Sequence, residues 1–532
     1  MDFITSIYTK EPYYKDDGKK WFRWGGKYED LWIYNAKDSA VTIEVKPPII
    51  EELDRMQNTE AFVEQNNLIN PLLYMQAHGI KVDIEGLKKA REDTIKQIDA
   101  KQEELNQIVG HDINVKSSQQ LQAYFYGKHK VKPYLKKGVP TCNETALKRL
   151  ARKTTTHKAF PEATIVLDIV HLRTILSNFI EVKLDKDERL RCSFNPIGAA
   201  DSGRLSSSKT IFKTGMNIQN QPEELRKYYV VDDGYIGYNM DLSQAENRIW
   251  AYVAPDFNMI RAFEEGIDIH SQTAALIFGL PIEEVSREDG SCPIGSGLHS
   301  QRFWGKKANH GLNYDLGYKT FALYYEISER EAKFIVDRYH TAYPGVRQGH
   351  AWIRTQLGRN RTLTNCRGRK RLFLDKWGDS LFKEAYSYIP QSTAVGKLNN
   401  DGLNYVYYNQ DLFRPVRLMN QVHDSIYFQI SLDEPWEVHA ECILLIKKNL
   451  ETPLEWQGRK FSIPCDLEVG FNMGKWKKDG TNPLGLKEVK VDRTETVAGL
   501  AGRLREIYRE FGTSPAIQAL DRDLSRSRLL KA

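Results

Sequence analysis

The spacing of apolar residues changes along this chain, and each spacing predicts a different element. Residues 49–110 and 262–350 carry apolar side chains every three or four positions, which is typical of helices. Residues 190–260 alternate between apolar and polar positions as strands do, before a helical stretch. Two β-rich runs follow near 405–430, and 461–476 has the pattern of a final strand pair. We therefore expect a fold that mixes helices and strands.

The segment Tyr235–Asp241 predicts a strand with a carboxylate at its end. Its apolar residues fall on one face of the strand, and Asp241 falls on the other. Ser243 and Glu246 have the spacing of a capping box that would open the next helix. A carboxylate between a strand end and a helix start is well placed to hold a metal ion. An Asp in a simple turn and a Glu that only caps would leave the same pattern.

A second carboxylate lies between two β-rich runs in Met419–Phe428. The pattern predicts a hairpin with His423 and Asp424 at its tip, although Asp is also a common turn residue. Two acidic tips from different strands would be able to converge on one pair of Mg²⁺ ions, because Mg²⁺ prefers a few carboxylates, water and phosphate oxygens. Such a two-metal site stabilises both the attacking and the leaving oxygen of a phosphoryl transfer.

Side chains at intervals of four residues predict a binding face on one helix. Arg302, Lys306, His310 and Tyr314 share this face because each step of four residues drifts by only about 40°. Two cations followed by two rings suit a nucleoside triphosphate, with its phosphates on the cations and its base against the rings. A basic surface helix is the simpler alternative. Gly311 inside the helix costs roughly 1 kcal/mol relative to Ala, which indicates a close neighbour.

Composition and charge narrow the class of protein. The chain has 532 residues, 41% hydrophobic and 27% charged, which is ordinary for a globular protein of two to four domains. Its net charge of +6 allows a polyanionic partner. The six cysteines lie far apart, no run of 18 apolar residues exists, and the first residues lack a signal-peptide pattern. We therefore expect an intracellular protein in a reducing compartment, with no membrane span.

Together these segments resemble the family A (DNA polymerase I-like) DNA polymerases. Asp241–Arg248 is similar to motif A of that family, Arg302–Tyr314 to motif B, and Gln421–Asp424 to motif C. The resemblance covers about 75–476 in the family's order. Its further segments are Ser202–Ser207, Asn217–Asn220, Asp268–Ala274 and Pro464–Gly470 with Trp476.

The resemblance implies a right-hand polymerase with an antiparallel-sheet palm, helical fingers and a helical thumb. The basic run at 116–160 would form thumb surface facing duplex phosphates, which supply affinity without sequence information. The implied divisions are connecting helices and thumb at 49–190, palm at 191–258 and 369–476, fingers at 259–368, and a helical C-terminal extension at 477–532.

The resemblance also implies a role for each site residue. Asp241 and Asp424 would be the catalytic carboxylates that hold two Mg²⁺ ions, with the Leu242 carbonyl as a further metal ligand. Glu246 would be a steric gate that fills the space needed by a ribose 2′-hydroxyl. The deoxynucleoside triphosphate would meet Gln244, Glu246, His270, Arg302, Lys306, His310 and Tyr314. Primer–template DNA would lie along Arg204, Asn217, Gln219, Asn220, Arg248, Gln391 and His423.

Three positions depart from the family pattern. His310 stands where Phe or Tyr is usual, Ser425 stands where motif C commonly continues with Glu, and Asp315 replaces the usual Gly after Tyr314. An imidazole is planar and can still stack, but the selection of sugar and base is left open. The two metal carboxylates are unaffected.

The expected function is template-directed DNA polymerisation in DNA replication, by a bacteriophage-like enzyme that would act in the host cytoplasm if it is viral. A single-subunit RNA polymerase shares the palm, but a carboxylate at Glu246 would exclude ribonucleotides. A non-catalytic DNA-binding remnant is the alternative from another class. The retention of both metal carboxylates, Arg302 and Lys306 argues against it.

The two ends of the chain carry separate expectations. Tyr34 and Asp38 resemble the last motif of the family's 3′–5′ exonuclease domain, so 1–48 is expected to be a remnant that ends at Pro47-Pro48. The matching first motif would lie well over a hundred residues earlier. We therefore expect no proofreading by this chain alone, and a separate exonuclease polypeptide that would cover the aromatic residues of 1–48; ordinary surface residues are the alternative.

The tail predicts a helical hairpin that docks on the palm or on a partner. Val497–Phe511 keeps one apolar helical face, and Gly512 is placed to end that helix. Thr513 and Pro515 would begin a second helix.

Overall fold

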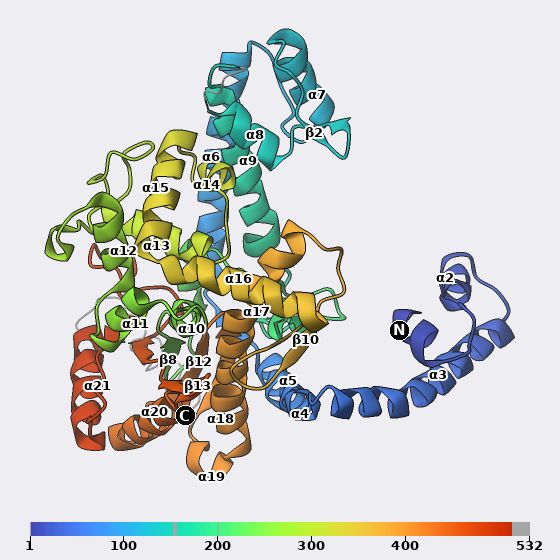
Figure 1. Ribbon diagram of the computed structural model, residues 1–532, viewed down its shortest axis with the longest axis vertical. Helices are drawn as coiled ribbons and strands as arrows, with labels where there is room; N and C mark the ends of the chain where they lie inside the picture. Colours follow the sequence, from blue (N-terminus) through green and yellow to red (C-terminus); the bar gives the residue numbers. More distant parts are fainter. Residues whose placement is uncertain (1, 153–156, 200–201, 513–532) are drawn as a thin grey trace, which may run out of the picture.

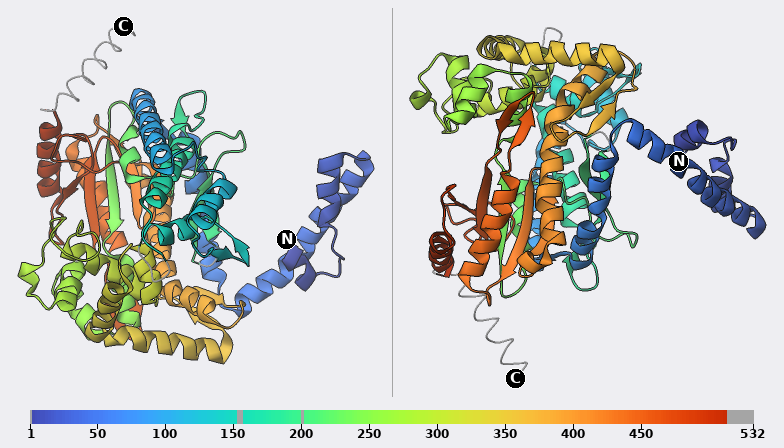
Figure 2. Two further views of the ribbon diagram at one scale, coloured as in Figure 1. Left: turned by 90° about the horizontal axis from the view of Figure 1, so that it is seen from above. Right: turned by 60° about the horizontal axis from the view of Figure 1, so that its bottom comes forward.

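The computed structural model describes residues 2–152, 157–199 and 202–512. It shows a hand-like body with a thumb rising from it, and an N-terminal arm that projects from the opposite end (Figure 1). The further views show the same arm standing clear of the body (Figure 2). Helices predominate, and all strand pairings of the sheets are antiparallel. The expected mixed fold is confirmed.

A five-stranded sheet forms the centre of the palm. Its order is β11-β12-β8-β15-β16, so strands far apart in the sequence become neighbours. The pairing of β8 with β12 runs from Tyr235 opposite Ser431 to Asp241 opposite Ser425. The strands are β8 (Tyr235–Leu242), β11 (Arg417–Val422), β12 (Ser425–Ser431), β15 (Cys465–Gly470) and β16 (Lys487–Val489).

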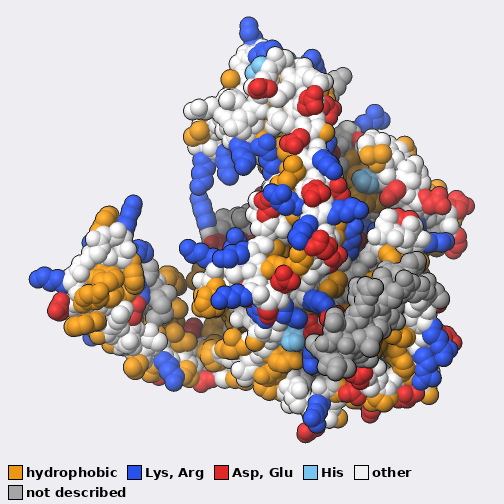
Figure 3. Space-filling view, turned by 180° about the vertical axis from the view of Figure 1, so that it is seen from behind, with side chains coloured by type: hydrophobic (Ala, Val, Ile, Leu, Met, Phe, Trp, Pro, Cys, Tyr) orange, Lys and Arg blue, Asp and Glu red, His pale blue; other side chains and the backbone are white. Residues whose placement is uncertain are grey.

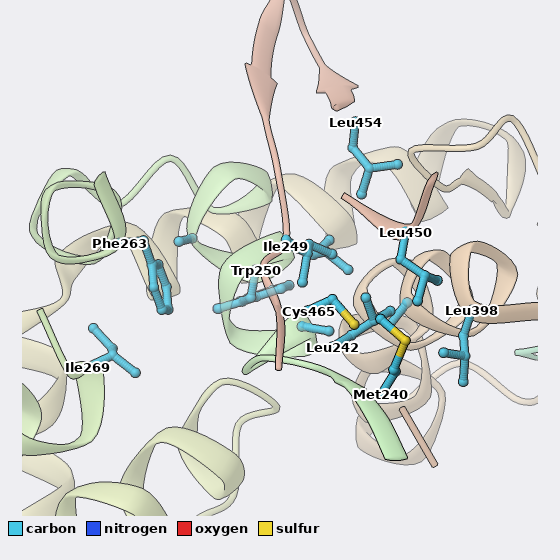
Figure 4. Close-up of a cluster of buried hydrophobic side chains, with 14 of the residues drawn as sticks. Met240, Leu242, Ile249, Trp250, Phe263, Ile269, Leu398, Leu450, Leu454 and Cys465 are labelled. Carbon is cyan, nitrogen blue, oxygen red and sulfur yellow. The ribbon is translucent and has the colours of Figure 1, made fainter. Parts of the chain in front are cut away.

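Helices bury the apolar face of β8, as its alternation predicts. Ile236, Tyr238 and Met240 are completely buried. In Figure 4, Met240 and Leu242 meet side chains such as Leu450 of α20. This packing fixes the strand end that carries Asp241. The covering helices are α10 (Ala245–Val253), α17 (Asp379–Lys397) and α20 (Trp436–Leu450).

The fingers are helical, and two of their helices approach unusually closely. A Cβ atom added at Gly305 of α13 would lie 2.1 Å from the carbonyl oxygen of His270 in α12, so only glycine fits. The close neighbour predicted at Gly311 is the Leu316 side chain, 2.9 Å from an added Cβ. The helices are α11 (Phe257–Glu264), α12 (Ile269–Phe278), α13 (Gln301–Leu312), α14 (Tyr318–Tyr324), α15 (Glu329–Ala342) and α16 (Pro344–Asn360).

The thumb is built on α6 (Ile84–Val109) and α9 (Pro161–Ile175), with α7 (Ser118–Gln122) and α8 (Glu144–Leu150) above them. The segment Pro161–Ile180 is long and apolar enough to cross a membrane by length and composition. Ile165, Val166 and Ile169 of this segment belong to the buried thumb core. We therefore interpret it as a core helix of the thumb.

Two expectations for the C-terminal region are wrong. Residues 461–476 do not form a strand pair, since β14 (Arg459–Phe461) pairs with β13 (Leu454–Trp456) and β15 joins β8 and β16. The extension after Trp476 is not purely helical, because β16 precedes α21 (Val497–Gly512). The strand β15 pairs with strands that are distant in sequence, and β14 pairs with the strand before it rather than with β15.

Docking of the tail on the palm is confirmed for α21. Leu500, Leu504 and Phe511 are buried against the main core. The ring of Tyr508 lies 5.3 Å from that of Trp436 in α20. The second helix expected from Thr513 lies outside the described residues.

The arm contains α1 (Asp2–Tyr8), α2 (Lys15–Trp24) and α3 (Tyr28–Arg55), and reaches the body through α4 (Thr59–Asn67) and α5 (Ile69–His78). The expected break at Pro47-Pro48 is wrong, because both prolines lie inside α3. Proline removes a backbone donor, but the helix is exposed here, so water can satisfy the freed carbonyls. Within the described residues of the arm, the hydrophobic core has Tyr14, Val41 and Val45 as its buried members.

Candidate active site

The two predicted metal carboxylates lie at the ends of neighbouring palm strands. Asp241 is the penultimate residue of β8, and Asp424 lies in the turn between β11 and β12. The backbone N–H of Leu242 donates a 2.9 Å hydrogen bond to the carbonyl of Asp424. Because Ser425 pairs directly with Asp241, the hairpin turn is held against the end of β8. The sheet therefore brings the two acidic positions together.

The surroundings of this pair disfavour two negative charges. Burial, together with repulsion from Asp424 and Glu468, raises the pKa of Asp241 to about 8. Burial and the nearby Glu246 raise the pKa of Asp424 to about 6. One carboxylate oxygen of Asp424, Oδ1, is buried without a hydrogen-bond partner in the described part of the chain. An orphaned hard oxygen beside a second carboxylate fits a divalent cation such as Mg²⁺.

The pair is not completed by a third acidic ligand. Ser425 stands where a further Glu was expected, and its hydroxyl donates to the Val422 carbonyl. Among the described residues, no group of three or more His, Cys, Asp or Glu side chains is arranged to hold a metal. Any bound cation would therefore depend on two carboxylates, on backbone carbonyls such as that of Leu242, and on ligands from outside the protein.

The predicted capping box at the start of α10 is wrong. Gln244 is the residue before the helix and has a left-handed backbone, with φ of 52° and no side-chain cap. Its Oε1 atom is buried without a partner among the described residues. Glu246 accepts an ion-paired hydrogen bond from Arg204 at one oxygen, and the Tyr314 hydroxyl donates to the other. The Glu246 carboxylate, which the local pattern assigned to a helix cap, is therefore bound by residues that are distant in sequence.

Arg302 in the fingers is oriented by a partner on the neighbouring helix. Its guanidinium donates to both oxygens of Asp268, at 2.6 and 3.0 Å. Burial alone would raise the pKa of Asp268, but the hydrogen bonds from Arg302 and Ser271 outweigh burial and lower it. Lys306, one turn further along α13, is exposed and forms no ion pair with a described residue. The helix α13 thus carries one cation that is held in place, Arg302, and one that is free of ion pairs with described residues, Lys306.

His270 is buried and held by the same pair of helices. The amide nitrogen of Asn309 lies 3.1 Å from its Nδ1. Burial, opposed by Asp268, lowers the pKa of His270 to about 3, so the ring is neutral. An amide nitrogen only donates, so Nδ1 accepts and the proton of the neutral ring sits on Nε2. The neutral His270 ring can therefore donate a hydrogen bond from Nε2.

The four-residue face on α13 is only partly as predicted. The helix ends at Leu312, so Tyr314 lies in the turn that follows, although its hydroxyl still reaches Glu246. His310 stands on the helix, with its ring 5.8 Å from that of His270. Asp315 has a left-handed backbone with φ of 59°, a conformation that Gly adopts at least cost. Its carboxylate is ion-paired with Arg347, which ties this turn to α16.

Among the expected DNA contacts, hydrogen bonds join Asn217, Gln219 and His423 through Gln421, whereas Arg248 lies apart from them. Asn217 accepts from the Ser207 hydroxyl at 3.0 Å, and the side chain of Gln219 donates to the Gln421 carbonyl at 2.5 Å. The Gln421 side chain donates in turn to the His423 carbonyl at 2.8 Å. Asn220 is exposed, and Gln391 is half-buried on α17. These residues run from β6 (Arg204–Ser208) to the hairpin of Asp424.

Arg248 is the outlier of this set. It donates to the Ser243 carbonyl at 3.1 Å, and its guanidinium lies 4.5 Å from the ring centre of Phe263. Residues two apart on a helix do not share a face, so Arg248 points away from Glu246. The structure does not bring it to the group that contains Arg204.

Sequence reasoning missed three supporting residues. Asp268 orients Arg302, Asn309 orients His270, and Gly305 lets α12 and α13 approach. Asp268 was detectable, because Asp is a favoured N-cap and its side chain accepts from the Ser271 N–H. Asn309 and Gly305 act across two helices and leave no local signal.

The carboxylate of the arm has a different environment. Asp38 of α3 is ion-paired with Lys15, and the Tyr14 hydroxyl donates to it at 2.7 Å. Tyr34 packs against α2, where an added Cβ at Gly18 would lie 2.5 Å from its ring. Tyr34 and Asp38 therefore hold the arm's helices together in this structure.

A palm sheet with two converging carboxylates, covered by helical fingers and flanked by a thumb, defines a right-hand polymerase domain. The chain belongs to DNA polymerase family A, whose family model matches residues 84–478.

Curated relatives and a solved structure agree with this assignment. DNA polymerase I of Chloroflexus aurantiacus is 25% identical over 468 residues, which is 80% of this chain and 46% of the relative. The thermostable DNA polymerase I of Thermus aquaticus is 26% identical over 426 residues, 75% of this chain and 46% of the relative. The chain thus spans about half the length of these relatives.

The POL domain of Pol1 from M. smegmatis, solved in complex with DNA primer-template and dNTP, is structurally similar with a TM-score of 0.68. It is 25% identical, and the match covers 82% of this chain and 74% of that one.

Proposed function

We propose that this protein is a template-directed DNA polymerase that adds deoxynucleoside triphosphates to a primer 3′ end by a two-metal mechanism. The observation that carries the proposal is the pair Asp241 and Asp424, placed side by side in a family A chain, with burial and neighbouring carboxylates raising both pKa values and no ion pair to either residue within the described part of the chain. When bound, two Mg²⁺ ions would lower the charge barrier between the primer hydroxyl and the reacting phosphate. Asp241, Asp424 and the Leu242 carbonyl would hold them.

The fingers supply the groups that would receive the triphosphate. Lys306 is exposed and forms no ion pair with any residue that the structure describes, so its charge is available to phosphate oxygens. Arg302 is already oriented by Asp268, and His270 offers the Nε2–H. The ring of His310 would lie against the nucleotide, beside Gln244 and Tyr314. Because Arg302 and His270 are held by their partners before substrate binds, these two side chains lose little conformational freedom on binding.

The proposed steric gate is Glu246. Its two oxygens are held by Arg204 and Tyr314, so the carboxylate cannot swing away from a ribose 2′-hydroxyl. This favours DNA rather than RNA synthesis, and a single-subunit RNA polymerase is the alternative that the gate disfavours. Primer–template DNA is the proposed partner, since the similar Pol1 domain was solved with primer-template and dNTP.

Three finer points belong to the same proposal. The setting would be DNA replication by a bacteriophage-like enzyme, in the cytoplasm of its host. Phe22, Trp24 and Trp32 of the arm are more than 60% exposed, and Figure 3 shows the arm as a separate lobe rich in hydrophobic surface. A separate exonuclease polypeptide is the proposed partner of this lobe, and excision by the chain alone is proposed to be absent.

Primer extension tests the function directly. The purified chain should extend a primer with deoxynucleotides in Mg²⁺, fail in EDTA, and insert ribonucleotides far more slowly. Efficient extension with ribonucleotides would favour the RNA polymerase alternative. DNA binding without any extension would favour the non-catalytic alternative.

A further inference from the structure

The loop between β6 and Asn217 presents two neighbouring apolar side chains to solvent. Ile211 is 85% exposed and Phe212 is 73% exposed. Ile211 is the most exposed large hydrophobic residue in the part of the chain that the structure describes. Single exposed apolar residues are common, but an adjacent Ile-Phe pair at the tip of a loop is a candidate contact surface. We call residues 208–216 the Ile-Phe loop.

Hydrogen bonds hold the base of the Ile-Phe loop in a defined conformation. The Thr210 N–H donates to the Thr214 carbonyl at 2.9 Å, and the Lys213 N–H donates to the Thr210 carbonyl at 2.9 Å. The two threonine hydroxyls lie 2.7 Å apart. Gly215 is buried, and its N–H donates to the Lys183 carbonyl at 2.7 Å. The protein thus builds a specific turn to display two apolar side chains in water.

The loop begins and ends at the proposed DNA contacts. Ser207 and Asn217, on either side of it, are joined by a 3.0 Å hydrogen bond. Even a fully extended chain would place Phe212 no more than about 18 Å from Ser207. One turn of DNA duplex is about 34 Å long. The tip therefore lies within about half a duplex turn of Ser207 and Asn217, beside the position where the primer–template would be contacted.

Charge favours nucleic acid over protein as the occupant. Lys209 and Lys213 flank the apolar pair, are exposed, and form no ion pair with a described residue. Unpaired lysines suit a polyanion, because each phosphate contact releases counterions. Apolar side chains such as Ile and Phe are also used against sugars and base steps of the minor groove. The two lysines of the loop suit the backbone phosphates of a duplex, and the two apolar side chains suit its minor groove.

We propose that the Ile-Phe loop is an additional, sequence-independent contact with the primer–template duplex. Lys209 and Lys213 bind backbone phosphates, while Ile211 and Phe212 pack into the minor groove beside the Arg204 and Asn217 contacts. This inference rests on the proposed polymerase function, because it takes the duplex as the substrate.

A double variant tests the apolar tip. Ile211→Ser with Phe212→Ser alters only exposed side chains, so the fold should be retained and the melting temperature unchanged. Fluorescence anisotropy with a labelled primer–template should show affinity reduced about tenfold, with an unchanged salt dependence. The control is Phe257→Ser at the start of α11, since Phe257 is 71% exposed and lies in the fingers rather than in the loop. The control should bind like wild type.

The lysines give an independent readout. Lys209→Ala with Lys213→Ala should weaken binding and reduce the slope of log affinity against log salt by about 2, one per lost phosphate contact. Wild-type affinity in the serine double variant would overturn the proposal, including the case in which the tip instead binds a protein. If wild type itself binds no primer–template, the proposed polymerase function fails as well, so the two failures are distinguishable.

Discussion

The palm and the N-terminal arm each contain an acidic position that family resemblance assigns to a two-metal site, yet their surroundings are opposite. In the palm, burial raises the pKa of Asp241 to about 8, and a buried carboxylate oxygen of Asp424 has no hydrogen-bond partner among the residues described by the structure. In the arm, burial alone would raise the pKa of Asp38, but hydrogen bonds from Lys15 and Tyr14 outweigh burial and lower it.

The comparison shows that the charges around each carboxylate distinguish the palm site from the arm better than the sequence motifs do. The arm supplies its own cation to Asp38, so that carboxylate is already neutralised within the fold. In the palm, Lys475 and Arg204 only partly offset the charge of the two carboxylates, so ionising both costs stability and favours binding of a divalent cation. A carboxylate that is ion-paired with a lysine stabilises the fold, whereas a pair of carboxylates without an ion-pair partner favours binding of a cation.

The largest expected effect is the loss of either palm carboxylate. Asp424→Ala or Asp241→Ala should reduce the single-turnover rate of primer extension by about 10³-fold or more, because metal stabilisation of the transition state is worth several kcal/mol. Binding of primer–template should remain close to wild type. Asp38→Ala is the matched control and should extend normally. Near wild-type extension by either palm variant would show that the metal site is misassigned.

The next effect concerns the choice of sugar. Glu246→Ala should raise ribonucleotide relative to deoxyribonucleotide insertion by about tenfold or more, equivalent to about 1.4 kcal/mol of discrimination. Tyr314→Phe, which removes one hydrogen bond but leaves the carboxylate, is the control and should change the ratio less. The ratio of kcat/KM values for the two nucleotides measures this. An unchanged ratio in Glu246→Ala would exclude the gate.

A smaller effect is expected on stability in the absence of metal. The folded state of Asp241 holds its proton up to about pH 8, whereas the unfolded chain releases it near pH 4, so this group makes stability fall as pH rises between these values. Asp241→Asn should therefore raise the free energy of unfolding in EDTA at pH 8, by roughly 1–3 kcal/mol since the carboxylate is partly exposed. The gain should vanish near pH 4. Denaturant titrations at both pH values would measure it, and an equal effect at both would contradict the assignment.

The smallest effect is expected in the arm. Asp38→Ala and Lys15→Ala should each destabilise the arm by about 1 kcal/mol, because the ion pair is partly exposed. Limited proteolysis between α2 and α3 would reveal the change. Neither variant should alter excision of a mismatched 3′ end, which we expect to be absent in wild type. Clear excision by wild type that Asp38→Ala abolishes would reverse the comparison between arm and palm.

The sequence predicted local features of the site well. Alternation placed Asp241 at the polar end of a buried strand, and the hairpin at Asp424 followed from two β-rich runs around a turn residue. Both depend on neighbours within a few positions, where periodicity is informative.

Prediction failed where distant contacts decide. Glu246 has the spacing of a cap but binds Arg204 and Tyr314, and β15 pairs with β8 rather than with the adjacent β14. The contact between Arg248 and the Phe263 ring also has no local signal in the sequence, and the role of Arg248 in DNA binding stays a prediction. No local pattern encodes these choices, because they are made by elements that meet only after folding.

The absence of a side chain at Gly305 has a mechanical consequence. At Gly305 the backbone of α13 rests directly on that of α12, and the buried Asn309 side chain of α13 is hydrogen-bonded to α12 beside it, so close packing and hydrogen bonds both resist sliding of one helix along the other. Arg302 on one helix and His270 on the other are therefore held at a fixed spacing by contacts that exist before any ligand is bound. The conformational entropy of placing these two groups is lost once, at folding, and is not lost again when a ligand binds.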